Sequence, residues 1–151
     1  MTTHSEKRKL PYSAQQMYDL VADVERYPEF LPWTAAARIR KRVPFEQGET
    51  MEADLVISFK VFRESFGSRV TLWPDKLRID TEYIDGPFEH MQARWEFRDL
   101  PEGGCEVAFS VDFEFRNAML RRVIGTFFNQ AMQRIVYAFE KRAKQLYGAP
   151  R

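Results

Sequence analysis

The hydrophobic positions between residues 39 and 115 alternate with polar ones, which is the period of a half-buried β-strand. The connections between the alternating runs are short and rich in Pro, Gly and Asp. This pattern predicts an antiparallel meander of about seven strands with one wet face. The clearest apolar face is Met51, Ala53, Leu55, Ile57 and Phe59. Further strands are expected over residues 39–43, 63–72, 77–83, 91–97 and 105–115, with a weak polar strand over residues 3–9.

Two segments have a helical period instead. Ser13 and Gln16 have capping-box spacing, and the apolar stripe that follows predicts a short helix from about Ala14 to Glu25, before Pro28 and Pro32. A wide apolar stripe from Ala118 to Leu146 predicts a helix ~44 Å long. Such a helix crosses a domain of this size, so it must lie on the sheet and supply half of the core. The expected fold class is α+β.

Composition narrows the class of protein. The 151 residues fit one domain, residues 1–151, and the formal net charge of +1 argues against a general DNA-binding protein. The chain has no N-terminal apolar run, no stretch long enough to span a membrane, and one cysteine. We therefore expect a soluble, intracellular protein. Phe, Tyr and Trp make up 15% of the residues, which is ample for an aromatic core.

Motifs for common chemistries are missing from the sequence. The glycines form no phosphate-binding loop, and His4, His90 and Cys105 lack the spacing of metal ligands. Cys105 shares the apolar face of its strand, which is typical of an inert core thiol. We therefore predict no catalytic residue and no metal site.

Three polar residues have the inward parity of their strands, namely Glu64, Ser68 and Thr81. Buried polar groups need partners. One interpretation has Glu64 wet at the end of a hairpin and both hydroxyls bonded to backbone, whereas the other has these groups contacting a ligand. Glu64 is the first polar candidate inside a pocket.

Several turns are unusually apolar for solvated loops. They either plug the core, or rim a cavity, or touch a membrane. These turns contain Phe30-Leu31-Pro32-Trp33, Pro44-Phe45, Val61-Phe62 and Pro87-Phe88. A two-residue turn that pairs Phe59 with Phe62 would point Phe62 inward, and a four-residue turn would leave it in the loop.

A basic run contains Arg38, Arg40 and Arg42 at alternate positions, so the three side chains are expected to share one strand face. Such a face suits phospholipid head groups or ribosomal RNA. The alternative is a solvated face whose charges are neutralised by neighbouring acids.

Several segments, in this order, resemble the coenzyme Q-binding branch of the START-like, polyketide-cyclase-type superfamily, and the match covers nearly the whole chain. They are residues 11–18 (PYSAQQMY), 27–33 (YPEFLPW), 85–88 (DGPF), 113–115 (FEF) and 138–143 (AFEKRA). The resemblance implies a helix-grip fold, in which a curved antiparallel sheet surrounds a long C-terminal helix and an apolar cavity. It also implies a hydrophobic ligand and, for this branch, ubiquinone and respiration. A sibling group, the bacterial ribosome-association toxins, shares most of these motifs but tends to have Gly where Trp33 stands, so Trp33 favours the quinone branch.

Pattern and resemblance together predict a single START-like lipid-binding domain that carries ubiquinone or a similar isoprenoid without catalysis and without a covalently bound cofactor. Its expected location is the cytoplasm, with peripheral contact to the inner membrane. One alternative is a toxin-like factor that binds the ribosome through Arg38, Arg40 and Arg42 and interferes with subunit joining. Another is a cyclase or dehydratase that uses Glu64 and Tyr83. The expected ligand-binding residues are Phe30, Leu31, Trp33, Phe59, Phe62, Glu64, Phe66, Ser68, Tyr83, Phe88, Trp95, Phe109, Phe113, Phe127 and Phe128.

Overall fold

The computed structural model describes residues 2–59 and 62–148 and contains an antiparallel sheet with two α-helices and a 3-10 helix. The elements in chain order are β1 (Thr2–Leu10), α1 (Ala14–Ala22), the 3-10 helix η1 (Val24–Glu29), β2 (Thr34–Phe45), β3 (Gly48–Phe59), β4 (Phe62–Trp73), β5 (Arg78–Asp85), β6 (Phe88–Asp99), β7 (Cys105–Phe115) and α2 (Ala118–Tyr147).

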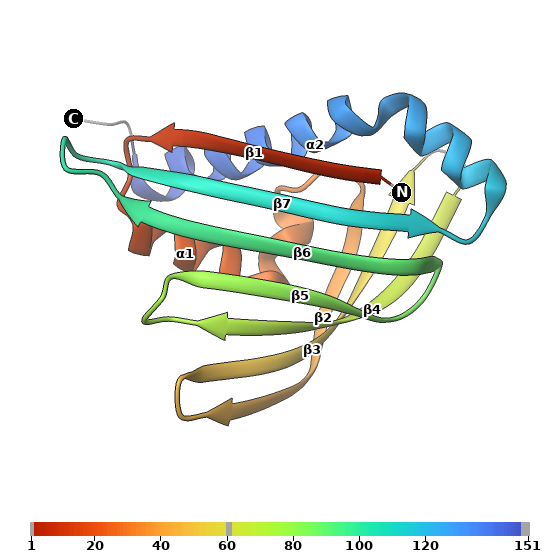
Figure 1. Ribbon diagram of the computed structural model, residues 1–151, viewed down its shortest axis with the longest axis horizontal. Coiled ribbons are helices and arrows are strands. Elements are labelled where there is room, and N and C mark those ends of the chain that lie inside the picture. Colours follow the sequence, from red (N-terminus) through yellow and green to blue (C-terminus); the bar gives the residue numbers. More distant parts are fainter. Residues whose placement is uncertain (1, 60–61, 149–151) are drawn as a thin grey trace.

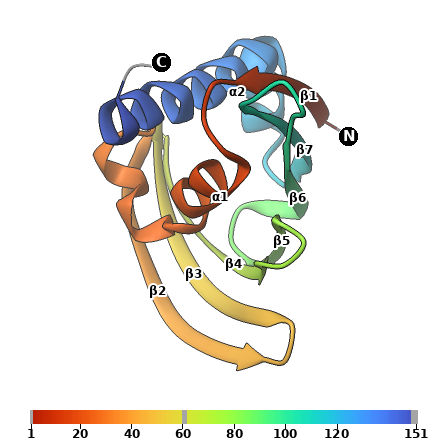
Figure 2. The same ribbon diagram turned by 90° about the vertical axis from the view of Figure 1, so that its left-hand side faces the viewer.

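The seven strands form one sheet in the order β1-β7-β6-β5-β4-β3-β2, and every neighbouring pair is antiparallel. The meander predicted from the alternating pattern is therefore confirmed, and β1 closes it by pairing with β7 (Figure 1). The sheet is strongly curved, with α1 inside the curve and α2 across its open side (Figure 2). This is the helix-grip arrangement.

The first helix begins as the capping box predicts. Ser13 Oγ accepts a hydrogen bond from the backbone N–H of Gln16 at 3.1 Å, and Gln16 Oε1 accepts one from Ser13 N–H at 3.0 Å. The predicted end at Glu25 is wrong, because α1 stops at Ala22 and residues 24–29 form η1 instead. Pro28 lies inside η1, where it cannot donate the backbone hydrogen bond that a continuing α-helix requires.

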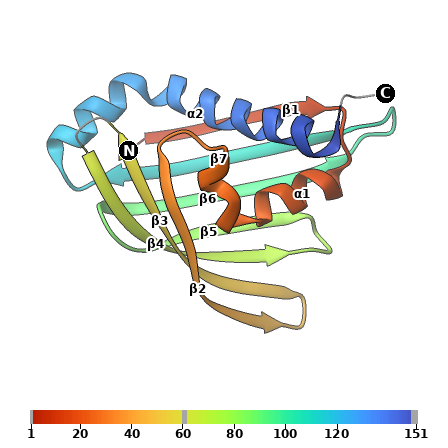
Figure 3. The same cartoon turned by 180° about the vertical axis from the view of Figure 1, so that it is seen from behind.

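The second helix is the long helix expected from the C-terminal stripe. Asn117 caps it, since its Oδ1 accepts hydrogen bonds from the N–H groups of Met119 and Leu120 at 2.8 and 3.3 Å. The helix has 30 residues, which at 1.5 Å per residue corresponds to a length of about 45 Å. Seen from behind, α1 and η1 lie on the same side of the sheet as α2 (Figure 3).

Strand registers refine two sequence predictions. Phe59 pairs with Phe62, so the β3–β4 hairpin has the shorter of the two turns considered. The turn after β4 has four residues, as the expected strand ends imply, but it lies one residue further along the chain, because Trp73 pairs with Arg78 and Leu77 adopts a positive φ of 49°. Residues two apart in a strand share a face, so the apolar parity is unchanged.

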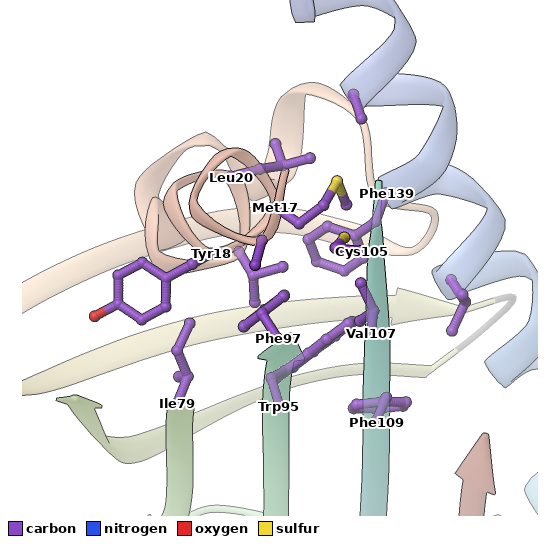
Figure 4. Close-up of a cluster of buried hydrophobic side chains, with 14 of the residues drawn as sticks. Met17, Tyr18, Leu20, Ile79, Trp95, Phe97, Cys105, Val107, Phe109 and Phe139 are labelled. Atoms are coloured by element: carbon purple, nitrogen blue, oxygen red, sulfur yellow. The ribbon is translucent and has the colours of Figure 1, made fainter. Parts of the chain in front are cut away.

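The tightest packing lies where α1 meets the sheet and the C-terminal half of α2. We call this region the α1 core and define it by Met17, Val21, Ala53, Cys105 and Ala143, none of which is more than 1% exposed. Side chains from α1, β5, β6, β7 and α2 meet around it, with Met17, Cys105 and Phe139 among them (Figure 4).

Candidate ligand-binding cavity

A cavity of about 530 Å³ lies between the inner face of the sheet and α2. Strands β3 to β7 form one wall, α2 forms the other, and the segment from Val24 to Thr34 closes one side. Small-molecule sites typically have volumes of about 300–1,000 Å³ and mostly apolar linings, and this cavity fits both criteria. The predicted residues that line it are Leu31, Trp33, Glu64, Phe66, Ser68, Phe88, Trp95, Phe109 and Phe113.

The aromatic side chains of the wall pack against one another along the sheet. Trp95 lies 4.3 Å from Phe109 between ring centroids, and Phe88 lies 5.2 Å from Phe66 and 5.6 Å from Phe113. Most of these pairs are edge-to-face or tilted, which is the favoured geometry for aromatic rings. The wall is therefore held together by its own contacts and stays in place around an open volume.

The inner wall contains one buried hydroxyl group. Ser68 on β4 is 2% exposed and lines the cavity. Its side chain has no hydrogen-bond partner among the described residues, so the alternative that it bonds to backbone is not what the structure shows. Thr81, on the neighbouring strand β5, lines the same wall. A hydroxyl is both donor and acceptor, so Ser68 can bond a polar atom of a ligand.

Glu64 also lines the cavity but lies at its exposed edge. The two interpretations, a solvated carboxylate at the hairpin end and a carboxylate in the pocket, therefore both hold in part, because Glu64 is solvent-exposed and also lines the cavity. Glu64 and Ser68 are four residues apart on one strand, which places them about 13 Å apart. Strand β4 thus supplies a polar group at the edge of the cavity and another deep in its wall.

Two tyrosines near the cavity have hydroxyls that already make internal hydrogen bonds. Tyr27 lines the cavity, but its hydroxyl donates to the carbonyl of Val21, and burial raises its pKa. Tyr83 is not part of the lining, and its hydroxyl accepts a hydrogen bond from Phe88 N–H at 3.1 Å. Tyr83 therefore fixes the connection between β5 and β6. It shares the inner face of the sheet with its partner Ser68 but packs behind Phe88 and does not line the cavity.

The loop between η1 and β2 supplies Leu31, Pro32 and Trp33 to the lining. Trp33 has a φ of +62°, which is rare for a bulky residue and costs about 1–3 kcal/mol. Its carbonyl accepts a hydrogen bond from Ser58 N–H of β3 at 2.8 Å, which holds the backbone in this conformation.

Phe30, the first aromatic of this loop, anchors the loop to α2 instead of lining the cavity. Its ring lies 5.3 Å from Phe139, and the guanidinium of Arg142 lies 5.2 Å above it. Arg142 also donates to Glu29 at 2.7 Å, and hydrogen bonds from Arg26 and then Arg142 lower the pKa of that carboxyl group. The prediction that Phe30 contacts a ligand is thus not supported by its position.

The remaining predicted aromatics lie elsewhere or outside the described part of the structure. Phe128 is buried against Phe113, with 5.1 Å between ring centroids, but does not line the cavity. The side chains of Phe59, Phe62 and Phe127 lie outside the described residues.

Sequence reasoning missed much of the helical side of the cavity. Gln130 and Arg134, one turn apart on α2, belong to the lining, and both are exposed at its edge. Their signal in the sequence is a position beside Ala131 and Ile135 on the border of the apolar stripe, which ordinary surface residues share. Other lining residues not proposed from the sequence include Val24, Tyr27, Met91, Ala93, Val111, Met132, Ile135 and Phe139.

The prediction that three arginines share one strand face is wrong. A β-bulge between Ile39 and Lys41 shifts the register, so that Arg38 pairs with Asp54 on the outer face and Arg42 pairs with the buried Met51 on the inner one. Arg40, at the bulge, contacts Asp54 at 3.0 Å. Arg42 contacts Glu49 at 2.6 Å. Acidic neighbours thus neutralise two of the three charges, as the alternative interpretation expects.

Within residues 2–59 and 62–148, we searched for side chains that could bind a metal ion or act as a nucleophile, and for helices that could span a membrane. No cluster of three or more His, Cys, Asp or Glu side chains in this part of the chain could hold a metal ion. Cys105 is fully buried, and this burial raises the pKa of its thiol to about 11, so the reactive thiolate is scarce at neutral pH. Of the helices described, none has the length and apolarity to span a membrane.

The fold and the cavity define a class of protein, the helix-grip domains that enclose a pocket between a curved sheet and a long helix. Comparison with known protein families agrees with this class. Residues 10–140 match the family described as polyketide cyclase / dehydrase and lipid transport, and the chain belongs to that family.

Relatives within the family have differing functions. The chain is 37% identical to the ribosome association toxin RatA of Rickettsia prowazekii over 97% of this chain and 99% of that one. It is 32% identical to the mitochondrial coenzyme Q-binding protein COQ10 homolog B of Xenopus laevis over 96% of this chain and 59% of the frog protein. An 18 kDa protein of Caulobacter crescentus, CC1736, has the same fold with a TM-score of 0.83 and 32% identity, over 99% of this chain and 100% of that one.

Proposed function

We propose that this protein binds a hydrophobic isoprenoid ligand, with ubiquinone as the leading candidate, and acts as a non-catalytic carrier that supports respiration. The observation that carries the proposal is an apolar cavity of about 530 Å³ with an unengaged hydroxyl, Ser68, in its wall. The coenzyme Q-binding relative supports the choice of ligand. The carrier works in the cytoplasm and contacts the inner membrane peripherally when it loads or releases its cargo.

The binding mode follows from the lining. A quinone ring contacts the aromatic wall formed by Phe66, Trp95 and Phe109, where dispersion and ring contacts stabilise it. Ser68 donates a hydrogen bond to a ring carbonyl, which removes the cost of leaving that oxygen unpaired in an apolar site. The natural polyprenyl tail exceeds a cavity of this size, so the remainder of the tail leaves through the exposed edge near Glu64.

The test is organic extraction of the protein purified from its native host, followed by mass spectrometry and by titration with decylubiquinone. We expect co-purified quinone and saturable binding. Ala93→Leu, which fills the cavity, should abolish most of the binding, whereas Ala108→Leu, on the outer face opposite Lys7 and Glu96, should leave it intact. Absence of any quinone or lipid, together with no binding in titration, would rule the carrier out.

A second candidate function is ribosome association. It is favoured by the identity of 36–37% with several ribosome association toxins, which exceeds the 32% with the coenzyme Q-binding relative. The outer face of β2 offers Arg38 and Lys41, which pair in register with Asp54 and Glu52 of β3. Phosphate groups of ribosomal RNA are natural partners for such cations.

Sucrose-gradient sedimentation tests this second candidate. Co-migration with one ribosomal subunit is expected, with loss of co-migration in the double variant Arg38→Glu, Lys41→Glu. Arg42→Glu is the matched control, because the bulge places Arg42 on the other face of the strand. Wild-type protein that stays at the top of the gradient would eliminate this function.

A further inference from the structure

The strained residue Trp33 stands out among the residues that line the cavity. It follows Pro32 in the loop between η1 and β2, and its backbone lies in the left-handed region at φ +62°. Only glycine adopts this region without steric cost. The backbone on the C-terminal side of Trp33 is fixed, because Trp33 O accepts a hydrogen bond from Ser58 N–H and Thr34 pairs with Ile57. The fold at this position thus holds a left-handed backbone conformation that is costly for a bulky residue.

Leu77 provides the internal comparison. Trp33 and Leu77 are the non-glycine residues with positive φ in the described part of the chain. Leu77 packs against the buried core and lies outside the cavity lining. Trp33 is part of the lining and is half-buried, which places its indole where the cavity meets solvent. Backbone strain at a residue that faces the cavity, such as Trp33, points to a role of that residue in ligand binding.

We propose that Trp33 determines ligand specificity by presenting its indole face to a planar, conjugated ring at the edge of the cavity. The neighbouring lining residues Leu31 and Ile57 are aliphatic and contact an alkyl chain as well as they contact a ring. An indole adds contact with a flat ring through offset stacking or edge-to-face packing, which an alkyl chain does not receive. Trp33 therefore selects ring-bearing isoprenoids, such as quinones, over simple aliphatic lipids.

This inference rests on the proposed function, since it requires a ligand in the same cavity. The test measures dissociation constants for decylubiquinone and for decanol, which has the same tail without the ring, by isothermal titration calorimetry. Trp33→Leu keeps a large apolar side chain at the strained position but removes the ring. We expect it to weaken decylubiquinone binding about 3- to 10-fold, which is the affinity equivalent of one aromatic pair. Decanol binding should change by less than about twofold.

Trp33→Phe is the matched variant, because it keeps an aromatic ring on the same backbone. It should restore most of the preference for the ring-bearing ligand that Trp33→Leu loses. Circular dichroism and urea unfolding confirm that both variants are folded. A ratio of the two dissociation constants that is the same in wild type and Trp33→Leu would overturn the assignment to Trp33 and leave the carrier intact. Wild-type protein that binds neither ligand would overturn both.

Discussion

The two ends of the concave face are packed differently. In the α1 core, Met17, Val21 and Cys105 are at most 1% exposed and the space between sheet and helices is filled. Along the cavity wall, Phe66, Met91 and Trp95 keep 7–8% exposure and face an open volume. Both regions have the same strands and the same alternation of apolar residues, so alternation alone does not decide whether a core is filled.

Helix length explains the difference. The nine residues of α1 extend about 13 Å, whereas the 30 residues of α2 extend about 45 Å along the same concave face. The first helix therefore fills the concavity only at one end, and over the rest a single layer of side chains from α2 faces the sheet. A curved sheet under one long helix and one short helix leaves a pocket beyond the end of the short one.

The largest effect that tests this contrast compares two methionines. Met17→Ala, in the α1 core, should lower the free energy of unfolding by about 2–5 kcal/mol, because the truncation opens a new void in close-packed surroundings. Met91→Ala, on the cavity wall, should cost about half as much, since one side of Met91 already faces open volume. Urea unfolding measures both. Equal losses would show that the two regions are packed alike.

The converse test enlarges two alanines that both point inward. Ala53→Leu, in the α1 core, should cost about 1–3 kcal/mol through overpacking, because Ala53 is fully buried. Ala93→Leu enlarges a residue of the cavity lining, so stability should be unchanged or higher while decylubiquinone affinity falls at least tenfold. Thermal unfolding and calorimetry give the two readouts. A strongly destabilised Ala93→Leu protein would contradict the open volume.

The sequence predicted the order of elements, the inward faces of the strands and the long helix, because these follow from local periodicity. It could not predict the bulge beside Arg40, since an inserted residue changes the register without changing the alternation nearby. Nor could it predict the direction of loop side chains. Phe30 and Trp33 belong to the same loop, yet Phe30 anchors the loop to α2 and Trp33 lines the cavity. Gln130 and Arg134 were missed because polar residues at the border of a helical stripe look like ordinary surface.

A smaller effect is expected at alkaline pH, where the protein should lose stability because of Cys105 in the α1 core. Burial raises the pKa of the Cys105 thiol from 9.0 to about 11. The unfolded chain therefore releases this proton at lower pH than the folded chain, so stability is fully present below about pH 9 and is lost as the pH rises toward 11. Urea unfolding at several pH values should show a shallower decline for Cys105→Ala. Parallel declines in the two proteins would mean that Cys105 does not carry the effect.

The smallest predicted effect concerns the half of α2 that spans the cavity. A Cβ at Gly125 meets no atom within 4 Å, so Gly125→Ala should stabilise the protein by about 0.5–1 kcal/mol through helix propensity alone. Ala143→Gly, in the buried half of the same helix, should cost at least that amount, because it adds lost packing to the lost propensity. Thermal unfolding measures both. Gly125 does not belong to the cavity lining, so decylubiquinone affinity should be the same in Gly125→Ala, and a large fall would show that binding requires this part of the helix to bend.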